Sequence, residues 1–411
     1  MFGNRVDRRA FLKLTAASAT LAACAPQTNA SKRRVAVIGG GIIGSSIAYH
    51  LATSGADVIL LERGQLAERA SRGTFAWINA TWAKQPKHYH EFNQSGLAGW
   101  KRLQSELGIP VRWGGSLEWF ESAERQSRLA DQIAEQVEWD EPAEMIGAEK
   151  LAQLEPNVDF SGAETVAFSP NDGAVDPVLA TKALAAATQQ AGGEIREGCS
   201  VQAVTTLEDG SVELATSCGP IKATDFVLAT GADPDATQAL AGLTIPQRST
   251  PGVIVVTKPM PPLINRIIVA PGVHIHQRED GRIVLGEQEG APDTEAHAER
   301  LRNRPNRFPD QAFAEQHAFQ ILGIAEKYVP GILSAEIEDV FIGWRPLPLD
   351  GHPVLGRSPN QSSAYLAIMH SGVSLAPIVG ELVAKEILSG EQAPGIEEYR
   401  PGRDFQTVRR Y

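Results

Sequence analysis

The chain has 411 residues, of which 43% are hydrophobic and 21% are charged, and this is the composition of an ordinary globular protein. Its length predicts two domains with a large buried core. A formal net charge of −11 at pH 7, with no basic patch among aromatic residues, argues against a nucleic-acid partner. No apolar run reaches the roughly 18 residues of a membrane span. No Cys or His spacing typical of a metal site is present, so we expect no metal.

Residues 1–24 have the pattern of an export leader. Arg8 and Arg9 are followed by Phe-Leu-Lys, which is similar to the twin-arginine export signal. A mildly apolar stretch then ends in Leu-Ala-Ala-Cys24, which resembles the lipobox of bacterial lipoproteins. We therefore expect lipidation of Cys24, with residues 25–32 as a tether, and a periplasmic or otherwise extracytoplasmic protein held at a membrane by its lipid only. A cytosolic protein with a frayed, basic N-terminus is the alternative.

Residues 34–63 predict a strand, a glycine-rich turn, a helix and a second strand that ends in an acidic residue. Gly39, Gly41 and Gly44 match the dinucleotide-binding fingerprint, which needs glycine for the tight turn, for the approach of the pyrophosphate and for helix–strand packing. The helix that begins there offers free N–H groups to phosphates. Glu62 lies at the tip of the second strand, where a carboxylate can accept the ribose hydroxyls. A glycine-rich turn that packs without any ligand is the alternative.

Further along the chain, the patterns alternate between strands and helices. Asp176 and Pro177 predict the start of one of these helices, as N-cap and first residue. The expected elements are, in order, a strand broken by a glycine turn at 111–120, a helix at 121–137, a helix at 176–192, a β-meander at 195–214, a buried strand at 225–231, several strands at 251–289, a helix at 294–328, a strand at 365–369 and a helix at 372–389.

Two cysteines remain after Cys24. Cys199 and Cys218 lie in neighbouring strand-like segments and could form a disulfide in an oxidising compartment. Two buried thiols are the commoner arrangement in proteins.

Several separate blocks resemble the FAD-dependent D-amino-acid oxidase family, which includes glycine oxidase, sarcosine oxidase and D-amino-acid dehydrogenase. The likeness extends over residues 33–392, which is nearly the whole chain after the leader. The blocks that carry it are the fingerprint and its continuation at 39–49, Leu-Glu-Pro at 154–156, Asp-Gly-Ala-Val-Asp-Pro at 172–177, Ala-Thr-Gly at 229–231, Trp-Arg-Pro at 344–346 and Asp-Gly-His-Pro-Val-Leu-Gly at 350–356.

The resemblance implies an α/β fold in which a Rossmann-like FAD-binding domain is interrupted by a substrate domain of the α+β type with a mixed β-sheet. The FAD-binding domain is expected at 33–105, 163–242 and 339–395, the substrate domain at 106–162 and 243–338, and a C-terminal tail at 396–411.

The same resemblance implies which residues bind the FAD cofactor. Besides the fingerprint glycines and Glu62, they come from the helix start, the second strand end, the loop that follows it, the adenine side and the segment under the flavin pyrimidine. They are Ile42, Ile43, Arg63, Arg69, Ala70, Ser71, Val201, Gly231, His370, Ser371, Gly372, Val373, Ser374 and Leu375. The last segment begins a helix, whose dipole would stabilise negative charge on the N1–C2 carbonyl side of reduced flavin.

The activity implied is oxidation of the C–N bond of an amino acid or N-substituted amino acid by hydride transfer to flavin, with hydrolysis of the resulting imine. Arg345 matches the family arginine that binds the substrate carboxylate, and guanidinium geometry suits such a bidentate contact. The substrate would be a small amine with a carboxylate, and oxygen or a quinone would accept the electrons. A structural salt bridge is the alternative role for Arg345.

His274 falls near a family active-site tyrosine and is a candidate for substrate contact, and it shares one strand face with His276. A structural or surface histidine is the alternative for both. A 2-hydroxy-acid dehydrogenase on the same fold would need a base, which His274, His276 or His370 could supply. A lipoprotein that holds FAD without turning anything over is a third hypothesis.

The substrate side also departs from the family pattern. A second substrate arginine of some members is absent near His370, and the segment 69–82 differs from that of glycine oxidase. Glycine or sarcosine is therefore not assumed as the substrate. The tryptophans at 77, 82, 113 and 119 could line an apolar pocket or fill the core.

Overall fold

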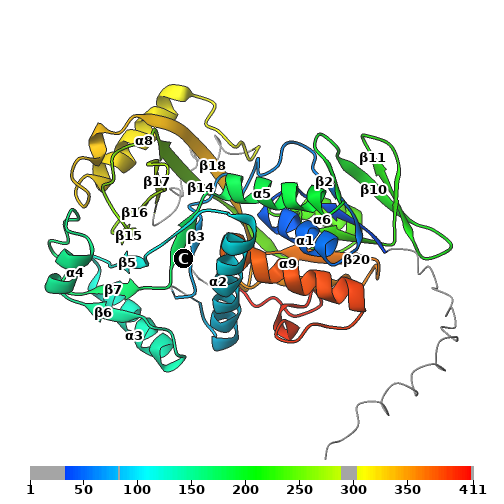
Figure 1. Ribbon diagram of the computed structural model, residues 1–411, viewed down its shortest axis with the longest axis horizontal. Helices are drawn as coiled ribbons and strands as arrows, with labels where there is room; N and C mark the ends of the chain where they lie inside the picture. Colours follow the sequence, from blue (N-terminus) through cyan, green and yellow to red (C-terminus); the bar gives the residue numbers. More distant parts are fainter. Residues whose placement is uncertain (1–32, 82–83, 288–302, 409–411) are drawn as a thin grey trace, which may run out of the picture. The chain divides into compact units, whose positions relative to one another are not determined.

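The computed structural model describes residues 33–81, 84–287 and 303–408, which belong to one compact unit that extends from Arg33 to Tyr411. The export signal, Cys24, the tether and Trp82 lie outside the described residues. The predicted fold class is confirmed, because a mainly parallel sheet flanked by helices is combined with a larger mixed sheet (Figure 1).

The first large sheet has six strands in the order β19-β20-β13-β1-β2-β9. All neighbours in it are parallel except β19 and β20. Such a sheet is buried on both faces, which explains the continuous apolar runs of its central strands. Its strands are β1 (Arg34–Ile38), β2 (Asp57–Leu61), β9 (Glu194–Arg196), β13 (Asp225–Leu228), β19 (Val354–Arg357) and β20 (Ala364–Ile368).

Helices and a small meander cover the two faces of this sheet. On one face the core is formed with α1 (Ile42–Thr53) and α9 (Gly372–Ser389), and on the other with α6 (Pro234–Ala241) and the meander. The long α2 (Lys87–Leu107) packs against α9, and α5 (Pro177–Gln190) packs against α1. The meander consists of β10 (Val201–Thr206), β11 (Val212–Thr216) and β12 (Ile221–Ala223).

The second large sheet has eight strands in the order β18-β14-β17-β16-β15-β5-β7-β6. It is mixed, since β15 and β5 are parallel and the other neighbours are antiparallel. Helix α8 (Gln311–Ala325) packs on one face and forms the largest apolar core with it. Its strands are β5 (Ser116–Glu118), β6 (Glu144–Ile146), β7 (Val166–Ser169), β14 (Gln247–Thr257), β15 (Ile267–Ala270), β16 (Val273–Gln277), β17 (Ile283–Glu287) and β18 (Ile337–Pro348).

The remaining elements are short or peripheral. They are the three-stranded sheet of β3 (Trp77–Ile78), β8 (Gly173–Val175) and β4 (Val111–Trp113), the helices α3 (Ala123–Glu138) and α4 (Ala148–Leu154), and the 3-10 turns Ile332–Ser334 and Glu397–Tyr399. No helix in the described ranges is long and apolar enough to cross a membrane.

Most predicted elements are present, including α5 with its Asp176 cap, whose carboxylate accepts hydrogen bonds from the first turn. The helix predicted at 294–328 is wrong in its extent, because residues 303–310 are not helical and α8 begins at Gln311. The carboxylate of Asp310 accepts a hydrogen bond from the Ala312 N–H (2.9 Å) and so fixes this later start. Residues 294–302 lie outside the described residues.

The ranges predicted for the FAD-binding domain include two strands of the eight-stranded sheet. The prediction placed 163–242 and 339–395 in the FAD-binding half, yet β7 and most of β18 lie in the eight-stranded sheet. The reason for β18 is its length, because this strand pairs with β14 from Ile337 to Pro348 before the chain leaves the sheet.

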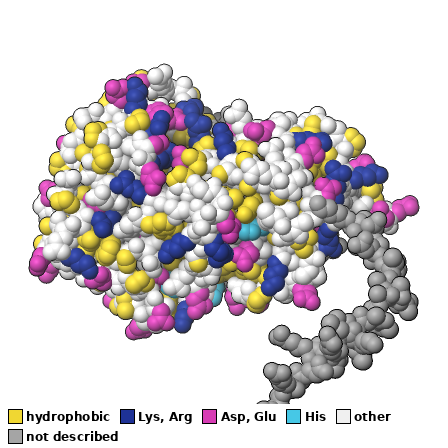
Figure 2. Space-filling view, in the orientation of Figure 1, with side chains coloured by type: hydrophobic (Ala, Val, Ile, Leu, Met, Phe, Trp, Pro, Cys, Tyr) yellow, Lys and Arg dark blue, Asp and Glu magenta, His cyan; other side chains and the backbone are white. Residues whose placement is uncertain are grey.

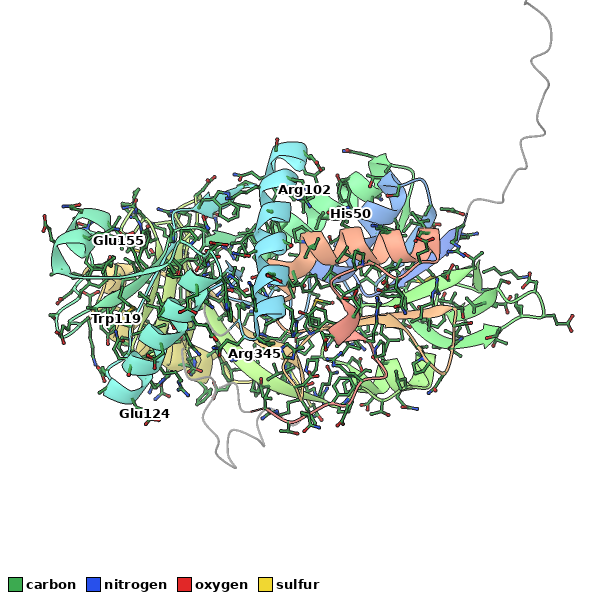
Figure 3. All side chains as sticks on the ribbon, turned by 90° about the horizontal axis from the view of Figure 1, so that it is seen from below. His50, Arg102, Trp119, Glu124, Glu155 and Arg345 are labelled. Atoms are coloured by element: carbon green, nitrogen blue, oxygen red, sulfur yellow. A yellow bond between two sulfur atoms is a disulfide. The ribbon has the colours of Figure 1, made fainter. Side chains whose placement is uncertain are left out.

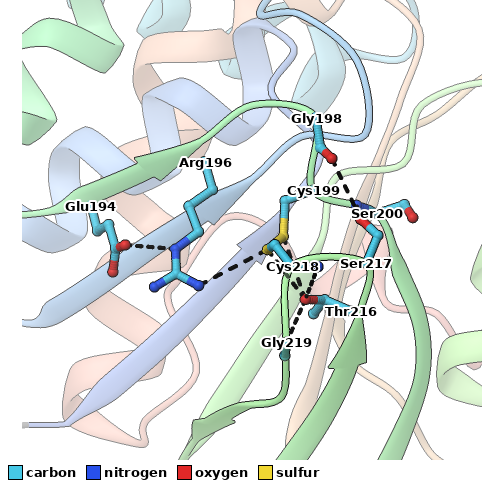
Figure 4. The surroundings of a disulfide bond; sticks show 9 residues. All are labelled: Glu194, Arg196, Gly198, Cys199, Ser200, Thr216, Ser217, Cys218 and Gly219. Carbon is cyan, nitrogen blue, oxygen red and sulfur yellow. Dashed lines mark hydrogen bonds and ion pairs between the residues drawn. A yellow bond between two sulfur atoms is a disulfide. The ribbon is translucent and has the colours of Figure 1, made fainter.

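Cys199 and Cys218 form a disulfide, with 5.6 Å between their Cα atoms (Figure 4). The expectation of two buried thiols as the commoner case is therefore wrong here, and Cys218 is exposed. The meander explains the pairing, because Val201 at the start of β10 lies opposite Thr216 at the end of β11. The two cysteines just outside these strands are thereby brought together.

Acidic and basic side chains are interspersed over the face that Figure 2 shows. This matches the moderate net charge of a chain with 49 acidic and 38 basic residues.

Candidate active site

A cleft of about 660 Å³ lies among the described residues, and this volume is typical of a small-molecule or cofactor site. Its lining begins at Gly39, after β1, and at Glu62, after β2, and it extends to His274 on β16 and Arg345 on β18. The cleft therefore joins the six-stranded sheet to one face of the eight-stranded sheet.

The glycine turn at one end of the cleft is shaped by close contacts that only glycine allows. Gly39 has a φ of +112°, and a Cβ there would lie 2.4 Å from the carbonyl oxygen of Ala229 on the neighbouring strand end. A Cβ at Gly44 would lie 1.9 Å from the Gly39 carbonyl oxygen, so this glycine permits the helix to pack on the turn, as predicted. Gly41 forms the N-cap of α1 without a side-chain hydrogen bond.

Glu62 is held rigidly by the backbone around it. Its two carboxylate oxygens accept hydrogen bonds from the Gly40 N–H (2.6 Å) and the Gly64 N–H (2.8 Å). A carboxylate with such partners stays at the end of β2, facing the cleft. Its neighbour Arg63 forms an exposed ion pair (2.9 Å) with Asp233, the N-cap of α6.

The wall beside Glu62 is formed by the segment that leads into the meander. Cys199 and Val201 line the cleft, and the Cys199 N–H donates a hydrogen bond to the carbonyl oxygen of Glu62 (2.8 Å). The disulfide to Cys218 ties this wall to the end of β11 (Figure 4).

The loop after β2 crosses the middle of the cleft. Arg69, Ala70 and Ser71 all line it, and the Ser71 hydroxyl accepts a hydrogen bond from the Ile42 N–H (2.9 Å) at the start of α1. A Cβ at Gly41 would lie 3.1 Å from the same hydroxyl oxygen. The loop and the helix start thus form one narrow cradle of backbone and hydroxyl groups.

The N-terminus of α9 faces the cleft at a second point. Ser371 precedes the helix in a left-handed conformation (φ +59°). The Ser374 hydroxyl donates to the carbonyl oxygen of Trp77 (3.2 Å) and accepts from the Asn79 N–H (3.1 Å). The indole N–H of Trp100 donates to the Val373 carbonyl oxygen (2.7 Å). These bonds fix the direction in which the helix start points.

Arg345 lies on β18, opposite Thr250 of β14, and Figure 3 shows its place in the middle of the chain's fold. Its guanidinium donates to the Pro251 carbonyl oxygen (3.3 Å) and lies over Gly252, where a Cβ would approach it to 3.0 Å. Close by, Gly343 crosses the loop at Gly73 so tightly that a Cβ on Gly343 would lie 1.8 Å from the Gly73 carbonyl oxygen. Gly252 therefore leaves space for the Arg345 guanidinium, and Gly343 allows β18 to cross the loop closely.

His274 lies on β16 and lines the cleft near Arg345. Burial, assisted by the positive charges of Arg345 and Arg125, lowers the pKa of His274 to about 3. The imidazole is therefore neutral at physiological pH. It packs edge-on against Phe75 (5.5 Å between ring centroids) and Trp77 (6.2 Å), so two aromatic rings contact it.

His276, two residues further on the same strand, takes a structural role. Its Nε2 is hydrogen-bonded to the carbonyl oxygen of Phe75 (2.9 Å), and burial lowers its pKa to about 3 as well. It does not line the large cleft.

Trp77 is anchored from behind by a buried acid. Its indole N–H donates to Asp172 (2.9 Å), whose same oxygen also accepts from the hydroxyls of Ser116 (2.7 Å) and Thr81 (3.3 Å). Burial is the main cause that raises the pKa of Asp172 to about 7. Glu118, also buried, has its pKa raised by burial and by the charge of Asp172.

Most of the predicted site residues line the cleft. Among those predicted, the ones that line it are Gly39, Gly41, Ile42, Ile43, Glu62, Arg63, Arg69, Ala70, Ser71, Val201, Gly231, His274, Arg345, His370, Ser371, Gly372, Val373 and Ser374. Gly44 and Leu375 do not. Leu375 packs in the core between α9 and the six-stranded sheet, one residue too far along the helix to face the cleft.

Many residues that line the cleft were not predicted as site residues, and Phe75, Asn79 and Lys84 are among them. They belong to the segment around β3, whose two-residue strand is too short to give a periodic pattern. The departure of this segment from the family pattern was the only signal. Trp77 also lines the cleft, whereas Trp119 packs in the core of the eight-stranded sheet.

The described residues contain no group of three or more His, Cys, Asp or Glu side chains that could hold a metal ion. The cleft instead offers glycine backbone, a helix N-terminus and the Glu62 carboxylate at one end, and the Arg345 guanidinium with aromatic rings at the other. The first set suits the phosphates and ribose of a dinucleotide, and the second suits a small carboxylate.

A family model described as FAD dependent oxidoreductase, DAO, matches residues 34–386. Glycine oxidase from Bacillus licheniformis is 29% identical over 362 residues, which cover 86% of this chain and 92% of that protein. A subunit of opine oxidase from Agrobacterium tumefaciens is 26% identical over 367 residues, which cover 86% of this chain and 93% of that protein.

Solved structures also share the fold. Glycine oxidase from Geobacillus kaustophilus superimposes with a TM-score of 0.80 at 23% identity, covering 91% of this chain and all of that one. L-proline dehydrogenase from P. horikoshii has a TM-score of 0.78 at 24% identity, covering 90% of this chain and 97% of that one.

Proposed function

The chain belongs to the DAO family of FAD-dependent oxidoreductases, and from that premise we propose that it oxidises the C–N bond of an amino acid or N-substituted amino acid. The observation that carries the proposal is Arg345, which lines the same cleft as the dinucleotide-binding turn, at the end away from it. An enzyme of this kind needs a site for the dinucleotide and a site for the substrate in the same cleft.

The described residues fit FAD well. Gly39 leaves no room for a Cβ beside the strand end at Ala229, and Glu62 is fixed where ribose hydroxyls can be accepted. The start of α9 would lie beside the flavin pyrimidine. Bound FAD would supply the acceptor for a hydride from the substrate α-carbon.

Arg345 would bind the substrate carboxylate through two parallel hydrogen bonds. Its position over Gly252 and its bond to Pro251 hold the guanidinium on the strand rather than in solvent. A clamped carboxylate fixes the α-carbon, and such orientation is a large part of catalysis in two-reactant steps. Exclusion of water from the cleft strengthens the ion pair.

The low pKa of His274 makes it a weak base, whereas oxidation of an amine needs no protein base. A neutral amine supplies its own electron pair, so no protein base is needed, and the imine product is hydrolysed by water. A hydroxy acid must lose its hydroxyl proton to a base, and a histidine whose pKa is about 3 is a poor one at neutral pH. His274 would then contact the substrate without transferring a proton.

Several relatives carry names that agree with this substrate class. Besides glycine oxidase and the opine oxidase protein, 4-methylaminobutanoate oxidase from Paenarthrobacter nicotinovorans is 28% identical over 386 residues, although the chain spans only 44% of that protein. Phe75, Trp77 and His274 line the cleft, so an apolar side chain or N-substituent of the substrate would have aromatic rings to contact there.

Anaerobic flavin bleaching tests the proposal. The purified protein without its leader, residues 25–411, is mixed with D-amino acids, L-amino acids, N-methyl amino acids and 2-hydroxy acids while the visible absorbance of the flavin is followed. Bleaching by an amino compound is the expected result. Bleaching by hydroxy acids only would contradict it, and a bound flavin that no compound reduces would favour the non-catalytic lipoprotein. Readmission of air then tests oxygen against a quinone as the electron acceptor.

We also propose twin-arginine export and lipidation at Cys24. The Cys199–Cys218 disulfide supports an oxidising compartment, since disulfides persist there and are rare in reducing cytosol. Labelling with a radioactive or clickable fatty acid should tag the wild type and not Cys24→Ala. Replacement of Arg8 and Arg9 by Lys should retain the protein in the cytosol, and export through another route would contradict this part of the proposal.

A further inference from the structure

Lys84 is the one lysine that is buried in the part of the chain that the structure describes, with 6% of its surface exposed. It follows β3 along the chain and lines the cleft. Burying an ammonium group costs several kcal/mol unless its surroundings compensate. A buried lysine that faces a cofactor cleft is therefore a candidate for a functional role.

The contacts of Lys84 place its charge at the start of α9. Its Nζ donates a hydrogen bond to the Ser371 hydroxyl (2.8 Å) and lies 5.5 Å from the ring centroid of Tyr89. The Tyr89 hydroxyl also donates to the Ser371 hydroxyl (3.2 Å). Ser371 is the N-cap of α9, so the ammonium lies directly beside the positive end of this helix.

Two positive groups of different origin thus meet at one point of the cleft. The helix N-terminus carries a partial charge of about one half, and the ammonium adds a full charge. Both favour a ligand on which negative charge develops at that point. Reduction of a flavin, or attack of an anion on it, places negative charge on the N1–C2 carbonyl side, which α9 is proposed to face.

We propose that Lys84 is a tuning residue for the flavin, held by Ser371 so that its charge stabilises the reduced, anionic cofactor. The inference rests on the proposed position of the flavin pyrimidine at α9, and it does not depend on which substrate is oxidised. Lys84 acts beside the helix dipole and not through proton transfer.

Sulfite binding and the flavin midpoint potential test the proposal without any substrate. Sulfite adds through its sulfur lone pair to N5 of oxidised flavin, and the negative charge moves to the N1–C2 side. Lys84→Met should weaken sulfite binding at least 10-fold in the FAD-loaded protein. The two-electron midpoint potential should also fall, by about 30 mV for each tenfold loss in the stabilisation of reduced over oxidised FAD. Lys84→Arg, which keeps the charge, should stay near the wild type.

Lys87 provides the matched control, because it lies three residues further along and its side chain is 56% exposed, in an ion pair with Glu91. Lys87→Met should leave both quantities unchanged. Ser371→Gly removes the hydroxyl that holds Lys84 and suits the left-handed backbone, so it should give an intermediate loss. It also serves as the deciding variant if Lys84→Met does not retain FAD.

The proposal would be overturned if Lys84→Met retains FAD, binds sulfite within twofold of the wild-type affinity and keeps its midpoint potential within 10 mV of the wild type. If Lys84→Met loses FAD, the proposal would be overturned by a Ser371→Gly variant whose sulfite affinity and midpoint potential equal those of the wild type. If no amine reduces the wild type but Lys84→Met still shifts the potential, the proposed substrate class fails and the role of Lys84 stands.

Discussion

The two ends of the cleft are built in different ways. At the dinucleotide end, the glycine turn with Gly39 and Gly41 and the carboxylate of Glu62 come from one local strand–helix–strand unit, residues 34–62. At the substrate end, the side chains of Arg345 on β18 and His274 on β16 are brought together by the pairing of distant strands.

This difference determines which positions of the cleft tolerate substitution. Backbone recognition requires glycine wherever the chain approaches itself, and the side chains around it are less restricted. Side-chain recognition depends on strand register and on the space around one guanidinium. Substitutions at the two ends should therefore separate cofactor binding from turnover.

The largest expected effect belongs to Arg345→Ala. Loss of the guanidinium removes the proposed carboxylate contact, which is worth about 3–4 kcal/mol in a desolvated site, so kcat/KM for the substrate found by bleaching should fall about 100- to 1,000-fold. The flavin content and its absorbance spectrum should stay at the wild-type level. Steady-state kinetics and the ratio of flavin to protein measure the two effects.

Arg248→Ala is the matched control, because Arg248 lies exposed on β14 and bonds the Val408 carbonyl oxygen away from the cleft. It should keep full turnover. If Arg345→Ala instead loses FAD or unfolds, Arg345 has a structural role and the two ends of the cleft are not separable.

A somewhat smaller effect is expected for Gly343→Ala, which acts on the support of the substrate end. A Cβ there would lie 1.8 Å from the Gly73 carbonyl oxygen, so the loop and β18 must separate, and overpacking of this kind costs about 3 kcal/mol. Urea unfolding of the flavin-loaded protein should show this loss. Gly147→Ala, where nothing lies within 4 Å of the added Cβ, should change stability by less than about 1 kcal/mol.

Glu62→Gln probes the opposite end and should have a smaller effect again. The amide can accept one of the two backbone hydrogen bonds but presents an N–H group to the other donor, which costs about 1–2 kcal/mol. The dissociation constant for FAD should rise about 10-fold, while KM of the loaded enzyme stays unchanged. Glu194→Gln, at an exposed pair with Arg196, should alter neither, and an altered KM in Glu62→Gln would show that the ends are coupled.

The same contrast explains what could be predicted from the sequence. The glycine turn, Glu62 and α9 follow from local patterns, since fingerprint spacing and hydrophobic period are both short-range signals. The predicted helix 372–389 has the bounds that the structure gives for α9. Arg345 could be proposed only through the family resemblance, because no local pattern tells which strand faces a cleft.

The remaining failures have physical causes of the same kind. The disulfide of Cys199 and Cys218 depends on the register of β10 and β11. Lys84 reaches the start of α9 through a contact between residues 287 positions apart. Long-range pairing of this sort leaves no periodic signal in a single sequence.

A pH-dependent effect, about 1 kcal/mol for each pH unit, sharpens the comparison by asking how the wall behind Trp77 is held. The pKa of Asp172 is raised from 3.8 in the unfolded chain to about 7 by burial, so the folded protein keeps a proton that the unfolded chain has lost. Its contribution to stability is therefore fully present below pH 4 and is lost as the pH rises through 7, at about 1 kcal/mol per pH unit. Asp172→Asn cannot titrate and should lack this slope.

Urea unfolding of the FAD-loaded wild type and Asp172→Asn at pH 5, 6 and 7 measures the difference directly. The gap between their free energies of unfolding should move in favour of the variant as the pH rises. Glu118, whose pKa is raised in part by the charge of Asp172, is present in both proteins. It should therefore contribute less than Asp172 to the difference between their free energies of unfolding. A gap that is constant with pH, or that moves in favour of the wild type, would mean that Asp172 is ionised in the fold and holds the Trp77 indole as a charged acceptor.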